Sequence, residues 1–134
     1  MSLMQVQYKG NFRTEAVHLD SQNKIITDAP KDNQGNGEAF SPTDLLCTSL
    51  ASCMLTIMAM KAKSLNVDLG PVEIRLEKKM ASAPRKVGEI VLHFDWKGLD
   101  ARIPADQLAA LKDAGLSCPV YLSLAAEVKK TLHW

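Results

Sequence analysis

Aromatic residues and excess charge of either sign are both scarce in this sequence. Phe, Trp and Tyr make up 5% of its 134 residues, and 16 Lys and Arg residues face 15 Asp and Glu residues, for a formal net charge of +1. A nucleic-acid-binding surface needs a basic excess for the phosphates, or aromatic side chains on which bases stack. Neither is present, so we expect no nucleic-acid partner.

A long apolar run that could cross a membrane is also lacking. The longest stretch without a charged side chain, residues 45–60, is shorter than the ~20 residues of a spanning helix. The N-terminus has no basic start followed by a sustained apolar run, which is the pattern of a secretory signal. We therefore expect no membrane association and a cytoplasmic location. Residues 1–3, which precede a second methionine, resemble a cloning addition.

Cysteine is also scarce, and the number and spacing of the cysteines argue against a disulfide scaffold and a zinc site. The chain has three cysteines, and no two have Cys-x-x-Cys spacing. A disulfide framework uses an even number, and a structural zinc site uses closely spaced pairs. We expect no metal and no cofactor. In a reducing cytosol such cysteines are either buried packing residues or working thiols.

What the sequence does contain is a regular order of strands and helices. Apolar and polar residues alternate in several short segments, and a long apolar segment lies between them. Strands are expected at 5–8, 12–19, 24–27, 72–80, 89–96 and 129–134, and helices at 42–64, at 104–114 and from Cys118 to about 126. Gly115 is expected to end the second helix. The segregation of strands from helices predicts an α+β fold, which we expect to form one domain over 1–134.

The long helix has a strong start and an unusual surface. Ser41 can cap it, Pro42 suits its first position, and Asp44 can close a capping box. Its middle section is apolar on nearly every side, so the helix needs cover all round. One small sheet covers only one side, and we therefore expect a second subunit.

Two of the three cysteines are candidates for chemistry. Cys53 lies in the middle of the apolar helix, where a thiol is more often a small packing group than a nucleophile. Cys118 is expected at a helix start, where free N–H groups and the helix dipole stabilise a thiolate. Cys47 points about 120° away from Cys53 on the same helix, and we interpret it as core packing. Position alone leaves packing and chemistry both open for Cys53 and Cys118.

Two segments together resemble the OsmC/Ohr family of osmotically inducible and organic hydroperoxide resistance proteins. The segment FSPTDLLCTSLASCM (40–54), with its spacing from Pro42 to Cys53, is similar to the family's reactive-cysteine segment. The segment LSCPVYLSL (116–124) is similar to the second family motif, a Cys-Pro pair at a helix start. The resemblance implies antiparallel sheets packed on a long central apolar helix, in an intertwined homodimer.

The resemblance also implies a thiol-dependent peroxidase that reduces organic hydroperoxides. Cys53 would be the peroxidatic thiol and Cys118 the resolving thiol, and an external thiol or dithiol would reset the pair. Apolar neighbours would suit an organic peroxide. The expected substrate pocket contains Phe40, Met54, Ile57 and Met58. A redox-sensing or small-molecule-binding protein of the same fold, without efficient turnover, is the alternative.

In this family an arginine supports the thiolate and a carboxylate orients the arginine. Arg13, at the start of the second expected strand, is the candidate arginine. The sequence departs from the family pattern at the carboxylate, because Thr43 stands where glutamate follows the helix-start proline. Asp44 and Glu38 are the two candidates to replace it.

Overall fold

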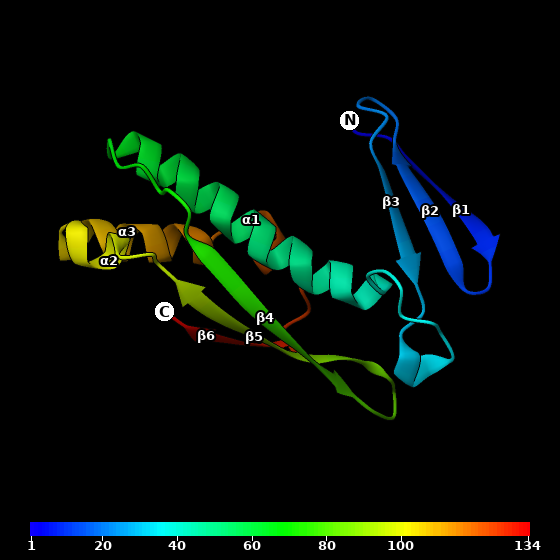
Figure 1. The fold of residues 1–134 in the computed structure, drawn as a ribbon. Coiled ribbons are helices and arrows are strands. Elements are labelled where there is room, and N and C mark those ends of the chain that lie inside the picture. Colours follow the sequence, from blue (N-terminus) through cyan, green and yellow to red (C-terminus); the bar gives the residue numbers. More distant parts are fainter. The chain divides into compact units, whose positions relative to one another are not determined.

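The structure, a computed structural model, describes residues 1–134 and divides into two compact units, 1–46 and 47–134 (Figure 1). Two three-stranded sheets and one long helix dominate it, which confirms the predicted α+β class. The first unit holds β1 (Met4–Gly10), β2 (Arg13–His18), β3 (Lys24–Asp28), the 3-10 turn η1 (Lys31–Asn33) and the start of α1 (Pro42–Ser64). The second holds the rest of α1 and β4 (Glu73–Ala81), β5 (Lys86–Asp95), α2 (Leu99–Arg102), α3 (Ala105–Leu116), α4 (Pro119–Ser123) and β6 (Lys129–His133).

The sheet of the first unit is an antiparallel meander in the order β1-β2-β3. Its register places Val6 opposite Ala16 and Ala16 opposite Ile25, so these side chains share one face. The last pair of the β2–β3 ladder joins Arg13 to Asp28. This pair puts an acidic and a basic side chain on the other face, at the end of the sheet where β2 begins and where β3 leads into the loop before α1.

Helix α1 begins with the predicted capping box. The Ser41 N–H donates to Asp44 Oδ2 at 2.9 Å, and the Asp44 N–H donates to Ser41 Oγ at 3.0 Å. These reciprocal bonds satisfy two N–H groups that the helix itself leaves without partners. The helix ends at Ser64, as predicted, just before Asn66 adopts a left-handed conformation with φ of 55°.

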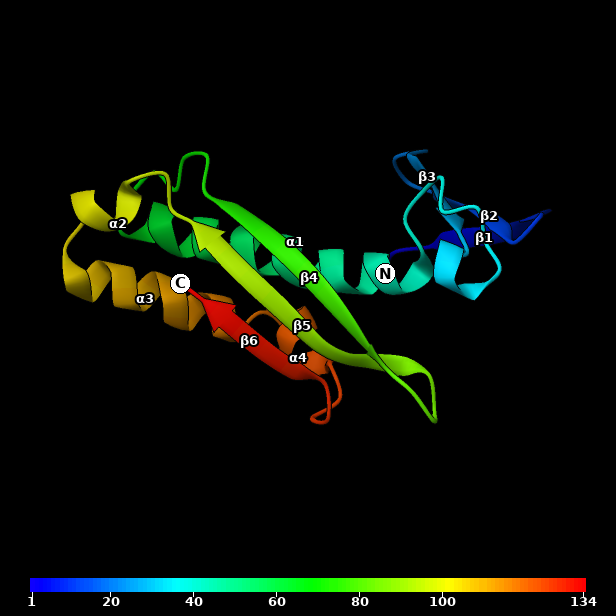
Figure 2. The ribbon, with the colours of Figure 1, turned by 60° about the horizontal axis from the view of Figure 1, so that its bottom comes forward.

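The sheet of the second unit has β5 in the middle, flanked by β4 and β6 (Figure 2). Strand β4 runs antiparallel to β5, but β6 runs parallel to it, with Glu89 opposite Lys129. The expectation of wholly antiparallel sheets is therefore wrong for this sheet, which is mixed. The reason is the connection between the two strands. After β5 the chain crosses over through α2, α3 and α4, so that β6 starts at the same end of the sheet as β5.

One face of this sheet carries the core, and α1 and α3 lie on that face (Figure 2). Ile90 and Leu92 of β5 are fully buried there. Along α1 the buried side chains recur every three or four residues, as one face of a helix requires. They are Cys47, Leu50, Ala51, Met54, Met58 and Ala62. The opposite face of the sheet carries polar pairs such as His93 with Glu77, whose Nε2 and Oε2 lie 2.7 Å apart.

Helix α3 continues through Gly115 to Leu116, so the prediction that Gly115 ends it is wrong. A Cβ at position 115 would lie 3.0 Å from Met58 Sδ and 3.3 Å from Met54 Cε. The glycine is present because α3 packs closely on α1, and not because the backbone needs a left-handed residue. Helix α4 ends at Ser123 and not near residue 126, because Leu124 is already extended with ψ of 141°.

By length and composition alone, α1 is also apolar enough to cross a membrane. A single helix of this kind is weak support for a membrane span, because the core helix of a soluble protein passes the same test. The buried face that α1 presents to Ile90 and Leu92 fits a core helix.

Candidate functional site

The thiols of Cys53 and Cys118 are neighbours within the second unit. Cys53 lies on α1, partly buried, and packs against the core cluster to which the fully buried Cys118 belongs. The Cys53 thiol lies close enough to Cys118 to contribute to the raised pKa of the Cys118 thiol. Both cysteines are free, so the pair is present as two thiols. Neighbouring thiols are the arrangement from which a disulfide forms once one of the two sulfurs is oxidised.

Cys118 occupies the N-cap of α4, as its sequence position predicted. Its Sγ accepts a hydrogen bond from the Tyr121 N–H at 3.3 Å. Burial nevertheless raises the pKa of the Cys118 thiol above its usual value, the Tyr121 N–H opposes that rise, and the nearby Cys53 adds to it. Burial is the largest of these contributions, so it outweighs the backbone N–H groups at the start of α4. The Cys118 thiol is thus protonated at neutral pH.

The third cysteine, Cys47, is 2% exposed and belongs to the same buried cluster as Leu50 and Met54. A free cysteine in such surroundings packs as a small apolar side chain. This placement agrees with the packing role expected for it.

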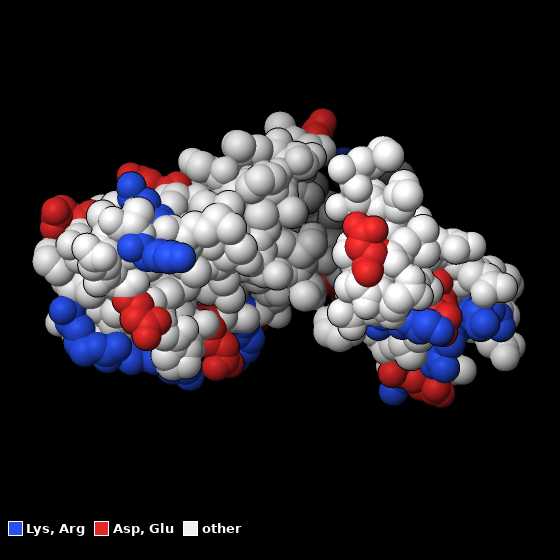
Figure 3. Space-filling view, turned by 90° about the horizontal axis from the view of Figure 1, so that it is seen from above, with Lys and Arg blue, Asp and Glu red and all other residues white.

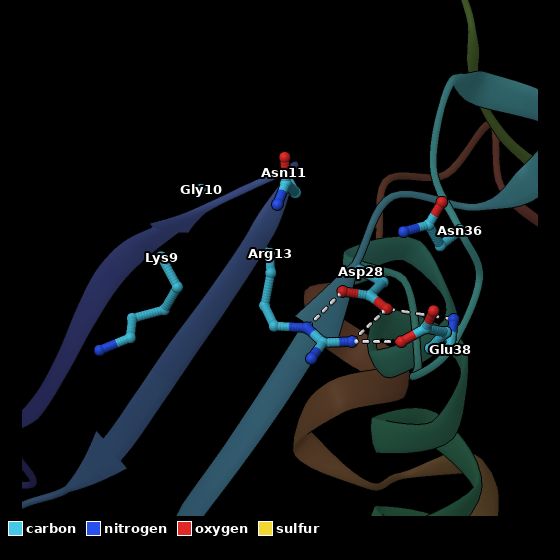
Figure 4. Close-up of a pocket in the computed structure, with 7 residues that line it drawn as sticks. All are labelled: Lys9, Gly10, Asn11, Arg13, Asp28, Asn36 and Glu38. Atoms are coloured by element: carbon cyan, nitrogen blue, oxygen red, sulfur yellow. Dashed lines mark hydrogen bonds and ion pairs between the residues drawn. The ribbon is translucent and has the colours of Figure 1, made fainter.

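Arg13 lies in the first unit and forms a two-carboxylate ion pair (Figure 4). Its Nε donates to Asp28 Oδ1 at 2.7 Å, and its Nη2 donates to Asp28 Oδ2 at 2.8 Å. The same Nη2 donates to Glu38 Oε2 at 3.2 Å. These bonds raise the pKa of Arg13 further above its already high value. The hydrogen bond from Arg13 lowers the pKa of Asp28, so that its carboxylate stays ionised at neutral pH.

A polar pocket of about 280 Å³ surrounds this ion pair. Its walls come from the β1–β2 turn, from the adjoining ends of the three strands and from the loop before α1. They consist of Lys9, Gly10, Asn11, Arg13, Asp28, Asn36 and Glu38 (Figure 4). The formal charges of the lining side chains cancel, because two are basic and two are acidic.

The two candidate carboxylates have different surroundings. Glu38 contacts Arg13, although its side chain is 64% exposed. Asp44 accepts the Ser41 N–H in the capping box at the start of α1. Within the first unit, therefore, Glu38 is the candidate that reaches the arginine.

Asp28 was missed by the reasoning from sequence. It lies in a segment rich in turn residues, 28–37, just beyond the strand expected at 24–27. Asp28 is in fact the last residue of β3, is 3% exposed, and is the closest carboxylate to Arg13. The strand register held the signal, because an antiparallel pairing of 13–18 with 24–28 places residue 13 opposite residue 28.

The residues expected to form a substrate pocket have unequal exposure. Met54 and Met58 are fully buried, and both side chains lie beside Gly115 of α3. Ile57 is partly buried against the cluster that contains Cys118. Phe40 is 53% exposed. Ile57 is therefore the one expected pocket residue that is partly open and packs on the same cluster as the two thiols.

The fold and the thiol pair together define an α+β protein with neighbouring cysteines on a core helix and at a helix start. The family model for OsmC-like proteins matches residues 35–133, which is most of the chain. The chain therefore belongs to the OsmC-like family.

Solved structures similar to this chain extend over its whole length. A protein from Psychrobacter arcticus 273-4, described as a candidate osmotic stress induced and detoxification response protein, is 41% identical with a TM-score of 0.88, over 98% of this chain and 94% of its own. An organic hydroperoxide resistance protein OsmC from Legionella pneumophila is 20% identical with a TM-score of 0.75, over 98% of this chain and 94% of its own.

The organic hydroperoxide resistance protein OhrB of Bacillus subtilis is 15% identical with a TM-score of 0.65, over 99% of this chain and 96% of its own. The likenesses at 20% and 15% identity support the fold. Among curated proteins none matches this chain.

Proposed function

We propose that this protein is a thiol-dependent peroxidase that reduces organic hydroperoxides and serves in the response to oxidative or osmotic stress. The observation that carries the proposal is the neighbouring pair of free thiols, Cys53 and Cys118, in a protein of the OsmC-like family. Relatives described as organic hydroperoxide resistance proteins and as a candidate stress and detoxification protein support the same reaction.

The proposed reaction has three steps. The Cys53 thiolate attacks one peroxide oxygen, the O–O bond breaks, and the departing alkoxide takes a proton and leaves as an alcohol. Cys53 is then a sulfenic acid. The Cys118 thiol attacks the sulfenic sulfur, so that a disulfide forms and water leaves. An external thiol or dithiol reduces the disulfide by exchange and returns both thiols, which fits the reducing cytosol in which we expect the protein to work.

The different burial of the two thiols supports different steps for them. Cys53 is partly exposed and can be reached by a substrate, whereas Cys118 is fully buried. Burial also raises the pKa of the Cys118 thiol, which fits a resolving thiol that is protonated before the first step. The cluster beside them is apolar and includes Met54 and the partly buried Ile57. Such surroundings favour a peroxide with an organic group over hydrogen peroxide.

Arg13 is the proposed cation of the reaction. A guanidinium can stabilise a thiolate and the charge that develops on the departing oxygen. Of the expected carboxylates, Glu38 contacts Arg13 and is the better candidate to orient it, whereas Asp44 has a capping role.

A second copy of the chain is the proposed partner. Met4, Val6, Tyr8 and Ile25 lie on one face of the first sheet, and each is more than half exposed. The outward surface of α1 in the second unit is also nearly free of charged side chains (Figure 3). Exposed apolar faces of this kind mark protein interfaces, and a homodimer covers both kinds of surface at once.

The dimer is tested by light scattering after size-exclusion chromatography. Val6→Lys puts a charge on the apolar face and is expected to give a monomer, while Gln7→Lys puts the same charge on the other face of β1 and is expected to leave the dimer intact. A monomeric wild-type protein would overturn this part of the proposal.

The peroxidase proposal is tested by mass spectrometry after one equivalent of cumene hydroperoxide. We expect the loss of two protons and a Cys53–Cys118 disulfide in the proteolytic map. Cys53→Ser should abolish peroxide consumption, and Cys118→Ser should retain a sulfenic acid that dimedone traps. Cys47→Ser is the matched control and should form the disulfide. An unchanged mass with three free thiols would refute the peroxidase.

One observation favours the alternative of a redox sensor without efficient turnover. The charge of Arg13 is already balanced by Asp28 and Glu38, which weakens its effect on any other group. A sensor would be oxidised once and would stay oxidised in the presence of dithiols. Repeated turnover with dihydrolipoamide or dithiothreitol would exclude it.

A further inference from the structure

The buried carboxylate of Asp28 is the principal partner of Arg13. It accepts two hydrogen bonds from the guanidinium, at 2.7 and 2.8 Å, whereas Glu38 accepts one at 3.2 Å from a largely exposed position. Two parallel bonds fix the plane of a guanidinium. A single exposed contact of a long side chain fixes little. The orientation of Arg13 therefore depends mainly on Asp28.

Asp28 is itself held in place from several directions. Its Oδ2 accepts the Glu38 N–H at 3.1 Å, and its own N–H donates to the Phe40 carbonyl at 3.0 Å. Its Cα is paired with that of Arg13 in the β2–β3 ladder. The carboxylate is thus a rigid support on which the more exposed guanidinium rests.

The bonds to Asp28 and Glu38 use only part of the guanidinium. They occupy Nε and Nη2, and Nη1 makes no hydrogen bond. Figure 4 shows this third nitrogen directed away from both carboxylates. The two N–H donors of Nη1 therefore point in a fixed direction and remain available to an incoming ligand. A guanidinium held in this way stabilises developing charge without first having to reorganise.

We infer that Asp28 is the positioning residue of the reaction: its buried carboxylate holds the guanidinium of Arg13 so that the Nη1 donors keep one direction. This inference rests on the proposed peroxidase function. It assigns to Asp28 the orienting role for which Glu38 and Asp44 were the candidates. Glu38 has a smaller part, through its single contact with Arg13.

The test is a double-mutant cycle of Asp28→Asn and Arg13→Lys, with kcat/KM for cumene hydroperoxide as the readout. Asp28→Asn should lower kcat/KM by about 10- to 100-fold, the usual effect of misplacing a group at a reacting centre. In the Arg13→Lys background the same change should have less than about a threefold effect, because residues that act through one another are not additive. Glu38→Gln should lower kcat/KM less than Asp28→Asn.

The matched control is Asp20→Asn, which removes the same charge from the exposed turn between β2 and β3, at the opposite end of that ladder. It should leave kcat/KM unchanged. The inference alone fails if the wild type is active and Asp28→Asn stays within a factor of two of it. It also fails if the effects of Asp28→Asn and Arg13→Lys simply multiply. A wild type that consumes no hydroperoxide overturns both the proposed function and this inference.

A measurement on the wild-type protein keeps the test independent of how well Asp28→Asn folds. The Nε–H of Arg13 should give a resolved ¹⁵N resonance that exchanges with water more slowly than that of the exposed Arg75. Acidification that protonates Asp28 should abolish the difference. Equal exchange of the two groups at neutral pH would show that Asp28 does not hold the guanidinium, and would overturn the inference.

Discussion

Replacing Gly115 by valine is expected to force α3 away from α1. A Cβ at position 115 already lies within 3.0 Å of Met58 Sδ and 3.3 Å of Met54 Cε, which is tighter than ordinary van der Waals contact. Valine adds two more methyl groups at this point. The two methionine side chains are flexible, but both are fully buried and have little room to withdraw. The substitution therefore overpacks the contact between the two helices.

The size of the effect follows from two opposing contributions. Overpacking a core costs about 1–3 kcal/mol, and the better helix propensity of valine over glycine returns ~0.3 kcal/mol. Gly115→Val should therefore lower the free energy of unfolding by about 1–2.5 kcal/mol, or the melting temperature by roughly 3–10 °C for a chain of this size. Gly115→Ala adds one methyl group and gains ~1 kcal/mol of helix propensity, so it should stay within about 1 kcal/mol of wild type.

Thermal and urea unfolding followed by circular dichroism measure both variants. The cause is isolated by a cycle with Met58→Ala, which removes the side chain nearest to the new methyl groups. Gly115→Val should cost at least ~1 kcal/mol less in that background, because the two positions are in contact. A Gly115→Val variant as stable as wild type, or equal costs in the two backgrounds, would refute the close packing of α3 on α1.

Three further predictions concern other parts of the chain. Gly35→Ala should destabilise the loop before α1, because a Cβ there would overlap the Ala29 carbonyl; faster hydrogen exchange in residues 29–37 checks this, and unchanged exchange contradicts it. The stabilisation from Asp28 should be fully present above its unfolded pKa near 3.8 and be lost as the pH falls through its lower folded pKa. Melting temperatures between pH 5 and 2 should then fall less steeply for Asp28→Asn than for wild type. Trp134→Ala should cost ~1–2 kcal/mol by removing a ring 4.4 Å from that of Phe94, whereas Trp134→Phe should cost less in the same unfolding assay.

Local sequence signals predicted most of the fold. The capping box of Ser41 and Asp44 fixed the start of α1, because both partners lie within one helical turn. The alternating segments became β4 and β5, and the weaker expectation of a last strand at 129–134 is confirmed by β6. These signals depend on neighbours in the chain, and they can be read without knowing the tertiary contacts.

The features that were missed depend on contacts between distant segments. The sequence around Gly115 is the same whether the glycine ends a helix or allows another helix to pack closely. Only the position of Met58 distinguishes these two roles. Asp28 looks like a turn residue until the β2–β3 register places it opposite Arg13. The parallel pairing of β6 depends on the path of the whole crossover, which no local pattern records.

The parallel pairing of β6 with β5 also sets the order in which the chain can complete its structure during synthesis. The contacts of the first sheet close within the first 28 residues, so this sheet can form while translation continues. The second sheet needs Lys129–His133, which are synthesised only after β5 and the three helices that follow it. Until then β5 has an unpaired edge, and such an edge can pair with another chain. A nascent or truncated chain that lacks residues 129–134 would keep this edge open, so aggregation is expected to begin from incomplete chains and not from the finished protein.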